Sequence, residues 1–278
     1  MELKTGNFKT NKHFFAFKSR LCGPFRIRMP KNRAIFQPMP PAPNPNSRNP
    51  DEVREMFARV APKYDLINRA MCGGLDRLWR ARAARAAAER AGPAPVLDLA
   101  CGSGDVALSM LRLSPSLRAV CCDLCPEMLE LARRKAEAAG FAGRAEFVRA
   151  DASALPFPPD SFSACAISFG FRNFADRPAC LREIRRVLAP GGRLAILEVA
   201  RAPGILEPVQ NFFMERCVPA VASLLGGCRA DYEYLAKTTR AFPRREELHA
   251  MIECAGFSEI SSRGMAFGFV ALTTASKK

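Results

Sequence analysis

The feature that most constrains this chain is a short apolar run that ends in a glycine-rich turn. Residues 96–105 have the sequence VLDLACGSGD, in which Leu99 is followed by Gly102 and Gly104 and then by Asp105. An apolar run of this length, closed by a Gly-x-Gly turn, is typical of a buried strand, a tight loop and the start of a helix. The sequence therefore predicts the first strand–loop–helix unit of a doubly wound α/β sheet.

Two classes of ligand suit such a loop. Gly102 and Gly104 fit the loose dinucleotide pattern G-x-G-x-x-G/A, and Asp123 follows about 20 residues later as the expected ribose acceptor. A pyrophosphate would sit on the helix N-terminus, and the nearby Asp98 and Asp105 would repel it. S-adenosylmethionine (SAM) has no phosphate but has an ammonium group and a sulfonium cation, which carboxylates attract. The charges therefore favour a SAM site.

Downstream of residue 96, short apolar runs alternate with helical patterns, as in a parallel sheet covered by helices. Strands are predicted at 96–99, 118–122, 145–149, 163–168, 193–198, 257–263 and 266–274. Helices are predicted between them at 105–113, 126–139, 177–188 and 244–254. The last two strands have no helix between them. We therefore predict the Rossmann-like class I methyltransferase fold, a mostly parallel sheet of seven strands with the last one antiparallel and helices on both faces.

Two segments lie outside this alternation. Residues 1–50 carry ten Lys and Arg residues against one acid and end rich in Pro and Asn, a composition that cannot build a core. We expect a disordered basic extension there, with Met29 as an alternative start of the protein. The methyltransferase domain is then predicted over 51–278, with a helical insertion at 205–240.

A helical cap is predicted before the first strand. Asp51 is suited to cap a helix that runs through about Val60, and an Ala- and Arg-rich helix is expected from Leu75 to Ala91. Helices in this position would lie over the open edge of the cofactor pocket. The alternative is that they only pack against the sheet.

The net charge of +15 is concentrated at the N-terminus. Of this charge, +9 falls in residues 1–50, which leaves +6 for the rest of the chain. The globular part is therefore only mildly basic, which favours an anionic membrane surface or an RNA backbone weakly. We expect no nucleic acid partner, although an RNA methyltransferase led by the basic extension stays an alternative.

The cysteines indicate a reducing compartment. Eleven cysteines is an odd number, and we expect reduced thiols in the cytoplasm. The one C-x-x-C pair, Cys122 and Cys125, has no partner pair at ligand spacing, so no metal site is expected. The sequence has no run of 18 or more uncharged apolar residues, so no membrane span is predicted.

Polar residues follow the predicted strands at the edge where ligands bind in open α/β sheets. Asp123 ends the second strand and is placed to accept both ribose hydroxyls. Asp151 ends the third, where a carboxylate and the N–H of Ala152 can bind the adenine edge. The fourth strand ends in Ser168-Phe-Gly-Phe-Arg-Asn173, where the methyl acceptor should approach. This segment lacks the Asn/Asp-Pro-Pro-aromatic run of amino-group methyltransferases, which argues against a nucleobase amine.

These residues and several other motifs resemble the UbiE/COQ5 quinone-biosynthesis C-methyltransferases. The resemblance extends from about residue 52 to 272, and the Tyr-Asp, Phe-Gly-x-Arg-Asn and Tyr-x-Tyr-Leu motifs are its most specific parts. The motifs are FARVAPKYD (57–65), LWR (78–80), 97–105, ALPF (154–157), SFGFRN (168–173), YEYLA (232–236) and AGF (255–257).

The resemblance implies a cofactor, a reaction and a set of contacts. The reaction is transfer of a methyl group from SAM to a ring carbon of a polyprenyl quinol. Demethylmenaquinol is the favoured acceptor, and a benzoquinol of the ubiquinone pathway is the alternative. The resemblance implies SAM contacts at Ser103, Asp123, Asp151, Ala152 and Ser168. Asp98, Gly102 and Gly104 are further predicted cofactor residues, because they form or flank the glycine turn.

A ring carbon attacks well only when a neighbouring hydroxyl has lost its proton, so the site must stabilise a phenolate. Arginine does not readily lose its proton, and we therefore assign Arg172 to holding the oxyanion. Asn173 would orient the ring. For the general base, our hypothesis is Asp65, Tyr64 or a water molecule that they hold. A SAM-binding regulator without catalysis is a further alternative, which the intact Arg-Asn pair disfavours.

A polyprenyl tail needs apolar surface. The predicted insertion supplies a candidate at 205–225, which includes Phe212, Phe213 and Leu224. The alternative is that these side chains face the core. We expect a cytoplasmic protein with peripheral contact to the inner face of the membrane, and the sequence carries no feature that sets an oligomeric state.

Overall fold

The computed structural model describes residues 49–202 and 204–278. The expected disordered extension and the alternative start at Met29 lie outside the described residues. Within the described part of the chain, no helix combines the length and apolar character that a membrane crossing needs.

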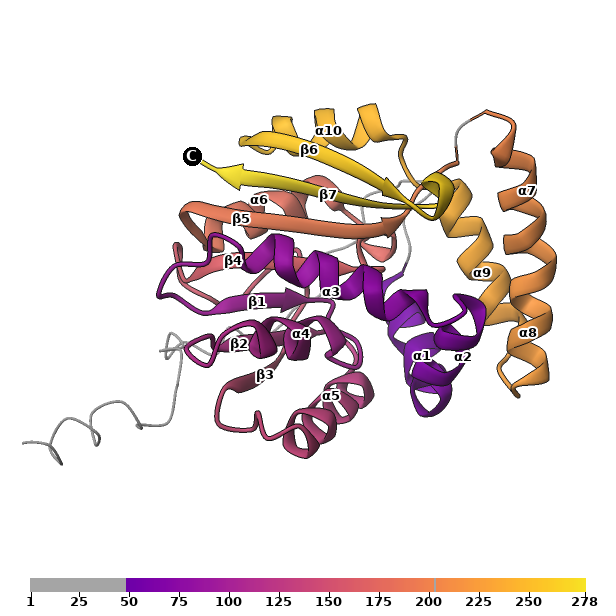
Figure 1. The fold of residues 1–278 in the computed structure, drawn as a ribbon, viewed down its shortest axis with the longest axis horizontal. Helices are drawn as coiled ribbons and strands as arrows, with labels where there is room; N and C mark the ends of the chain where they lie inside the picture. Colours follow the sequence, from indigo (N-terminus) through magenta and orange to yellow (C-terminus); the bar gives the residue numbers. More distant parts are fainter. Residues whose placement is uncertain (1–48, 203) are drawn as a thin grey trace, which may run out of the picture.

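One twisted sheet forms the centre of the molecule (Figure 1). Its seven strands have the order β3-β2-β1-β4-β5-β7-β6. They are β1 (Val96–Leu99), β2 (Ala119–Asp123), β3 (Ala145–Arg149), β4 (Phe162–Ser168), β5 (Leu188–Val199), β6 (Phe257–Met265) and β7 (Val270–Lys277). Strands β1 to β5 pair in parallel, whereas β7 is antiparallel to both β5 and β6. The predicted class I topology is confirmed.

Helices cover both faces of the sheet because neighbouring strand residues point to opposite sides. In β4, for example, Ala166 packs with the helices of one face, and the next residue, Ile167, packs with those of the other. The first face carries α3 (Leu75–Ala88), α4 (Asp105–Leu113) and α5 (Pro126–Ala138). The second face carries α6 (Arg177–Val187) and α10 (Arg245–Cys254).

Two helical segments that are far apart in the sequence lie side by side beyond the carboxyl ends of the parallel strands (Figure 1). The first contains α1 (Pro50–Val60), η1 (Ala61–Lys63) and α2 (Tyr64–Met71). The second contains α7 (Leu206–Phe212), the π-helical turn η3 (Phe213–Cys217), α8 (Val218–Leu224) and α9 (Arg229–Arg240). Ile67 of α2 is fully buried against Val218, Ala222 and Tyr232. The cap and the insertion therefore form one helical cover, which we call the cap layer.

Two local predictions were wrong. The cap of α1 is Asn49, whose side chain accepts the N–H of Asp51 at 3.0 Å, and Pro50 occupies the first helical position, which suits its fixed φ. Strand β5 begins at Leu188, although Pro190-Gly191-Gly192 predicted a break before residue 193. The strand passes this segment where the β4–β5 register shifts, so the glycines mark an irregularity in the pairing.

Candidate active site

The ends of the parallel strands bring most of the predicted cofactor residues together. The N–H of Gly102, in the loop after β1, donates to Asp123 Oδ2 at the end of β2 at 2.8 Å. The N–H of Ala150, after β3, donates to the Asp123 carbonyl at 3.2 Å. The loops after β1 and β4 are also close, because a Cβ at Gly170 would lie only 2.7 Å from the Cβ of Ala100. These contacts form one continuous edge.

The carboxylate of Asp123 keeps capacity for a ligand. Its Oδ1 accepts the N–H of Cys125 at 2.9 Å and its Oδ2 accepts that of Gly102, so each oxygen has one backbone donor. Burial raises the pKa of this carboxyl above its ordinary value, although these N–H groups oppose the rise. Since a carboxylate oxygen accepts two hydrogen bonds, Asp123 can still accept from a pair of hydroxyls.

The two loop glycines are required by backbone conformation and space. Gly102 has φ +52° and Gly104 has φ +78°. A residue with a side chain would be strained in this left-handed conformation. A Cβ at Gly104 would lie 2.9 Å from the Cβ of Ala132 on α5. The loop is therefore held tightly against α5, and Ser103 between the glycines is 1% exposed.

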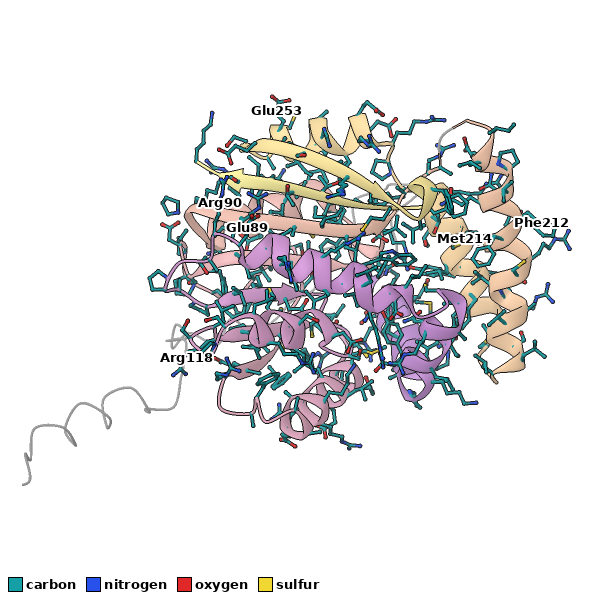
Figure 2. The ribbon with its side chains drawn as sticks, viewed as in Figure 1. Glu89, Arg90, Arg118, Phe212, Met214 and Glu253 are labelled. Atoms are coloured by element: carbon teal, nitrogen blue, oxygen red, sulfur yellow. The ribbon has the colours of Figure 1, made fainter. Side chains whose placement is uncertain are left out.

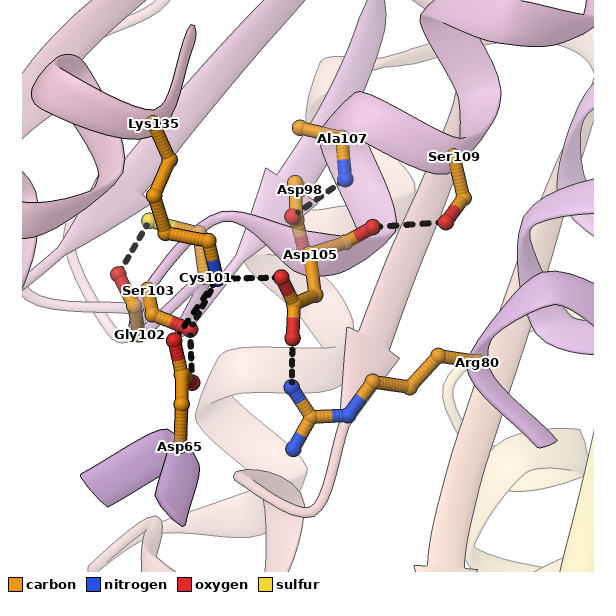
Figure 3. Close-up of polar contacts among 10 residues, drawn as sticks. All are labelled: Asp65, Arg80, Asp98, Cys101, Gly102, Ser103, Asp105, Ala107, Ser109 and Lys135. Atoms are coloured by element: carbon orange, nitrogen blue, oxygen red, sulfur yellow. Dashed lines mark hydrogen bonds and ion pairs between the residues drawn. The ribbon is translucent and has the colours of Figure 1, made fainter. Parts of the chain in front are cut away.

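A paired polar network surrounds this loop (Figure 3). Ser103 Oγ donates to Asp65 Oδ1 at 2.7 Å, and Lys135 Nζ lies 2.8 Å from Asp65 Oδ2 and 3.1 Å from Ser103 Oγ. Lys135 also pairs with Asp105, whose Oδ2 accepts from Arg80 Nη1 at 3.0 Å. Two carboxylates therefore meet two cations. The expected repulsion of a phosphate by Asp105 is wrong, because protein cations neutralise this residue.

Asp98 is placed beneath the loop and not at its surface. It is 1% exposed, and its Oδ2 accepts the N–H of Ala107 in the first turn of α4 at 2.8 Å. Burial raises the pKa of the Asp98 carboxyl to about 8, so the group is mostly neutral at pH 7. The expected direct attraction between Asp98 and a cationic ligand is therefore not supported, and Asp98 holds the helix start in place.

Asp65 is poorly suited to be the general base. Burial alone would raise the pKa of its carboxyl, but the hydrogen bonds from Lys135 and Ser103 outweigh burial and lower it. A carboxyl with a lowered pKa is a weaker base. The geometry instead makes Asp65 the link between α2 of the cap layer and the glycine loop.

A cavity of about 170 Å³ lies between the cap layer and the sheet edge. Most of its wall is apolar, and it contains two of the four predicted catalytic residues, Tyr64 and Arg172. Asp65 and Asn173 are not part of its wall. The ring of Tyr64 also covers the glycine loop, since a Cβ at Gly102 would lie 3.8 Å from Tyr64 Cε1. Tyr64 therefore stands at the boundary between the loop and the cavity.

Arg172 reaches the cavity from η2 (Phe171–Asn173), directly after β4. Its guanidinium pairs with Glu198 Oε1 of β5, and its backbone N–H donates to Glu198 Oε2 at 3.1 Å. Arg172 is 5% exposed and Glu198 is 2% exposed. An ion pair this deeply buried fixes the guanidinium in one orientation at the cavity wall.

Several functional candidates were not predicted from the sequence. Glu198 carried a signal, since it ends β5 at the ligand edge of the sheet. Asp76 and Arg80 also carried one, because their i, i+4 spacing puts both on one face of α3. Lys135 carried none, because its partners are distant in sequence. Phe169 also lines the cavity, and its φ of +57° is an uncommon conformation for a bulky residue.

The remaining predicted cofactor residues lie along the same edge. Asp151 Oδ1 accepts the N–H and the hydroxyl of Ser153, both at 2.8 Å, and Ala152 is buried. Ser168 Oγ is buried without a hydrogen-bond partner among the described residues. Because buried hydroxyls are almost always paired, this atom indicates a place for a polar ligand. These donors and acceptors fit a nucleoside that carries hydroxyl and amino groups, as SAM does.

Comparison with known proteins gives the family. The model of the "ubiE/COQ5 methyltransferase family" matches residues 46–277. The chain belongs to this family. It is a SAM-dependent methyltransferase of the quinone-methylating type, as its family and fold establish.

Individual relatives support this assignment. The chain is 46% identical over 218 residues to a demethylmenaquinone methyltransferase of Thermus thermophilus, an alignment that covers 78% of this chain and 97% of that protein. It is 39% identical over 221 residues to the ubiquinone/menaquinone biosynthesis C-methyltransferase UbiE of Paracoccus denitrificans, covering 79% and 88%. Among solved structures, a SAM-dependent methyltransferase of Thermotoga maritima has the same fold, with a TM-score of 0.56 at 18% identity over 81% of this chain and 99% of that one.

Proposed function

We propose that this protein methylates a ring carbon of a polyprenyl naphthoquinol and so converts demethylmenaquinol to menaquinol. The observation that carries the proposal is the apolar cavity beside the glycine loop, with the fixed guanidinium of Arg172 in its wall. An apolar ring fits such a wall, and one cation in it suits an oxygen that becomes negative during the reaction. The relative with 46% identity is named for this acceptor.

Each predicted residue has a part in cofactor binding under this proposal. SAM, when bound, supplies an electrophilic methyl group on its sulfonium. Asp123 accepts the ribose hydroxyls, Asp151 and Ala152 bind the adenine edge, and Ser168 donates its unpartnered hydroxyl. Gly102, Ser103 and Gly104 let the backbone approach the amino acid part, and Asp98 supports them from below.

The acceptor binds on the other side of Tyr64. Its ring enters the cavity with one oxygen toward Arg172, which lowers the energy of the phenolate that forms there. Tyr64 separates the two ligands except where the methyl group passes, and the cap layer keeps water out. Asn173 is not part of the cavity wall, so its predicted role of orienting the ring is not supported; its backbone N–H donates to the Gly170 carbonyl at 2.9 Å and so holds the turn that presents the guanidinium.

The cavity is too small to enclose a quinol ring together with a long prenyl tail. Pockets that enclose whole drug-sized ligands span about 300–1,000 Å³, whereas this one has about 170 Å³. The prenyl tail must therefore leave the cavity along an apolar path. Phe213 supplies one, because it lines the cavity and is also 38% exposed at the outer surface.

Outside the cavity, the insertion presents more apolar surface. Val209 is 56% exposed and Phe212 is 64% exposed on α7. In Figure 2, Phe212 lies on the outer side of this helix and Met214 on the side toward the sheet. We infer that this face contacts the bilayer in which the tail resides, so that residues 51–278 act as one methyltransferase unit peripheral to the membrane.

Transfer of labelled methyl from SAM tests the proposal. The acceptors are chemically reduced demethylmenaquinone and a demethoxy-type benzoquinol, each in detergent with the full-length protein. We expect transfer to the naphthoquinol at the higher rate. Transfer to both would make the enzyme dual. This is the second candidate function, because the Paracoccus relative is named for both ubiquinone and menaquinone biosynthesis. Binding of SAM with transfer to neither quinol would contradict the proposal.

A further inference from the structure

One carboxyl group of the cavity, that of Asp76, has no role in the proposed binding of SAM or the quinol. Asp76 is the second residue of α3, is 4% exposed and lines the cavity. Its Oδ1 is buried without a hydrogen-bond partner among the described residues, and none of the ion pairs found in this part of the chain includes Asp76. Leaving a buried carboxyl unpaired costs free energy. The position therefore indicates a ligand that supplies the missing partner.

A structural role at the start of the helix is the simplest alternative. Acidic residues in the first turn of a helix are favoured by the exposed N–H groups there. However, α3 begins after Gly74, which has a left-handed conformation, and no side chain caps the helix. The carboxylate of Asp76 accepts no N–H of this turn. It lines the cavity instead.

The surroundings of Asp76 are suited to proton transfer. The ionisable groups that face the cavity from the packed elements are Tyr64, Cys72, Arg80, Arg172, Asp231 and Tyr232. The pKa of the Cys72 thiol is raised to about 11 by burial and by the charge of Asp76, and the charges of Arg80 and Arg172 oppose this rise. The carboxylate and the two guanidinium groups thus all act on Cys72, which places them around one part of the cavity.

The other carboxylates near the site are already engaged. Asp65 is held by Lys135 and Ser103, as described above. Asp231 has one unpartnered oxygen, but its Oδ1 accepts from Arg59 Nη2 at 2.7 Å. Only Asp76 combines deep burial, a place in the cavity wall and the absence of a protein cation bonded to it among the described residues.

We propose that Asp76 is the general base that takes the proton of the quinol hydroxyl. The assignment rests on the proposed function. The O–H proton passes to the Asp76 carboxylate, and the phenolate that forms lies near Arg172. The neighbouring ring carbon then bonds to the methyl carbon as the sulfonium C–S bond breaks, which leaves a neutral thioether. As the products leave the cavity, the ring C–H proton passes to bulk water, its electron pair restores the aromatic ring, and the oxygen recovers its proton from Asp76.

The variant Asp76→Asn keeps the shape of the side chain and removes the base. With reduced demethylmenaquinone in detergent, we expect turnover to fall by about 10²–10⁴-fold, while the KM and the SAM affinity from a direct binding titration stay near wild type. Turnover of the variant should also rise about tenfold per pH unit, because only quinol that ionises without help then reacts. A purely structural role would not produce this pH dependence.

Two further variants make the test specific. Asp51→Asn is the control. Like Asp76 in α3, Asp51 is the second residue of its helix, but it is exposed and lies outside the cavity wall, so turnover of this variant should equal that of wild type. Asp76→Ala opens space beside the ring, and added formate should restore part of its turnover. This rescue reports on the base even where the variant is less stable.

The outcomes separate this proposal from the function on which it rests. Wild-type protein that transfers no methyl to the quinol would overturn the proposed function and the base with it. An active wild type, together with an Asp76→Asn variant within about tenfold of it and an unchanged pH profile, would overturn the base alone. A larger loss and pH change in Asp231→Asn would likewise assign the proton transfer to Asp231 and not to Asp76.

Discussion

The glycine loop and the cavity both hold carboxylates at the ligand edge of the sheet, but they hold them differently. Around the loop, Asp65 and Asp105 share Lys135, and Asp105 also pairs with Arg80. In the cavity wall, Asp76 and Asp231 each keep one buried oxygen that has no partner within the part of the chain that the structure describes. Each oxygen of the two loop carboxylates is therefore paired with a protein group, whereas the two cavity carboxylates keep capacity for a ligand.

This difference separates positioning from chemistry. Paired charges hold a loop in one shape and lose their reactivity, as the lowered pKa of Asp65 illustrates. Unpaired buried groups cost stability but remain available to a substrate. Arg172 combines the two, because Glu198 fixes it while it still forms part of the cavity wall.

The largest expected effect concerns this pair. Arg172→Ala leaves Glu198 as a buried charge without its partner, and we expect it to lower the free energy of unfolding by about 3–5 kcal/mol. The double variant Arg172→Met/Glu198→Leu should recover much of the stability but no turnover. Urea unfolding and methyl transfer measure the two effects.

The role of Arg172 in stabilising the oxyanion predicts a second, separate effect, on turnover. Arg172→Ala should lower turnover far more than SAM affinity, and equal losses in both would contradict the role. A loss of stability below about 1 kcal/mol would mean that the pair adds little to the fold.

The second prediction concerns a buried carboxyl on the loop side. Between the ordinary pKa of 3.8 and the value of about 8 in the fold, folded Asp98 keeps a proton that the unfolded chain has lost. Its contribution to stability therefore falls as pH rises through this window, by about 1.4 kcal/mol per pH unit. Asp98→Asn removes this slope. The free energy of unfolding of Asp98→Asn, relative to that of wild type, should therefore rise by about 2.7 kcal/mol between pH 5 and pH 7. Parallel pH curves would show that Asp98 is charged in the fold.

A third, smaller effect tests whether the loop network only positions. Lys135→Met removes the cation that Asp65 and Asp105 share, but these side chains are about one quarter exposed. We therefore expect a loss of about 1–2 kcal/mol, between the values for exposed and buried pairs. SAM affinity should fall several-fold, with less change in turnover at saturating SAM. The exposed Lys237→Met is the control. A Lys135→Met variant that loses turnover but not SAM affinity would assign the network to chemistry.

The smallest effect on stability is expected at the outer surface of the insertion. Phe212→Ser should change the free energy of unfolding by less than about 0.5 kcal/mol, since this side chain is 64% exposed. In vesicles, the KM for a quinol with a long prenyl tail should rise several-fold, and the KM for a tailless quinol should stay the same. Leu113→Ser, which is exposed on α4, serves as the control. An equal change in KM with both quinols would show that this face does not contact the prenyl tail.

Much of the fold was predictable because its signals are local. Hydrophobic alternation and glycine spacing depend on residues within one strand or helix, and β1, β3 and α4 have the predicted bounds. The errors occurred where local signals compete. Asp51 and Asn49 are both good caps, and packing against β4 carried β5 through a Pro-Gly-Gly segment.

The sequence by itself determined the sheet class, the family and the position of most candidate residues along the chain. Only the tertiary structure decided which charges are paired. Arg172 meets Glu198, and Asp65 meets Ser103 and Lys135, across separations of 26 to 70 residues. Among the described residues, Asp76 meets no such partner. Partners and burial depend on how distant elements pack, and these two properties decide whether an acid holds the structure or takes a proton.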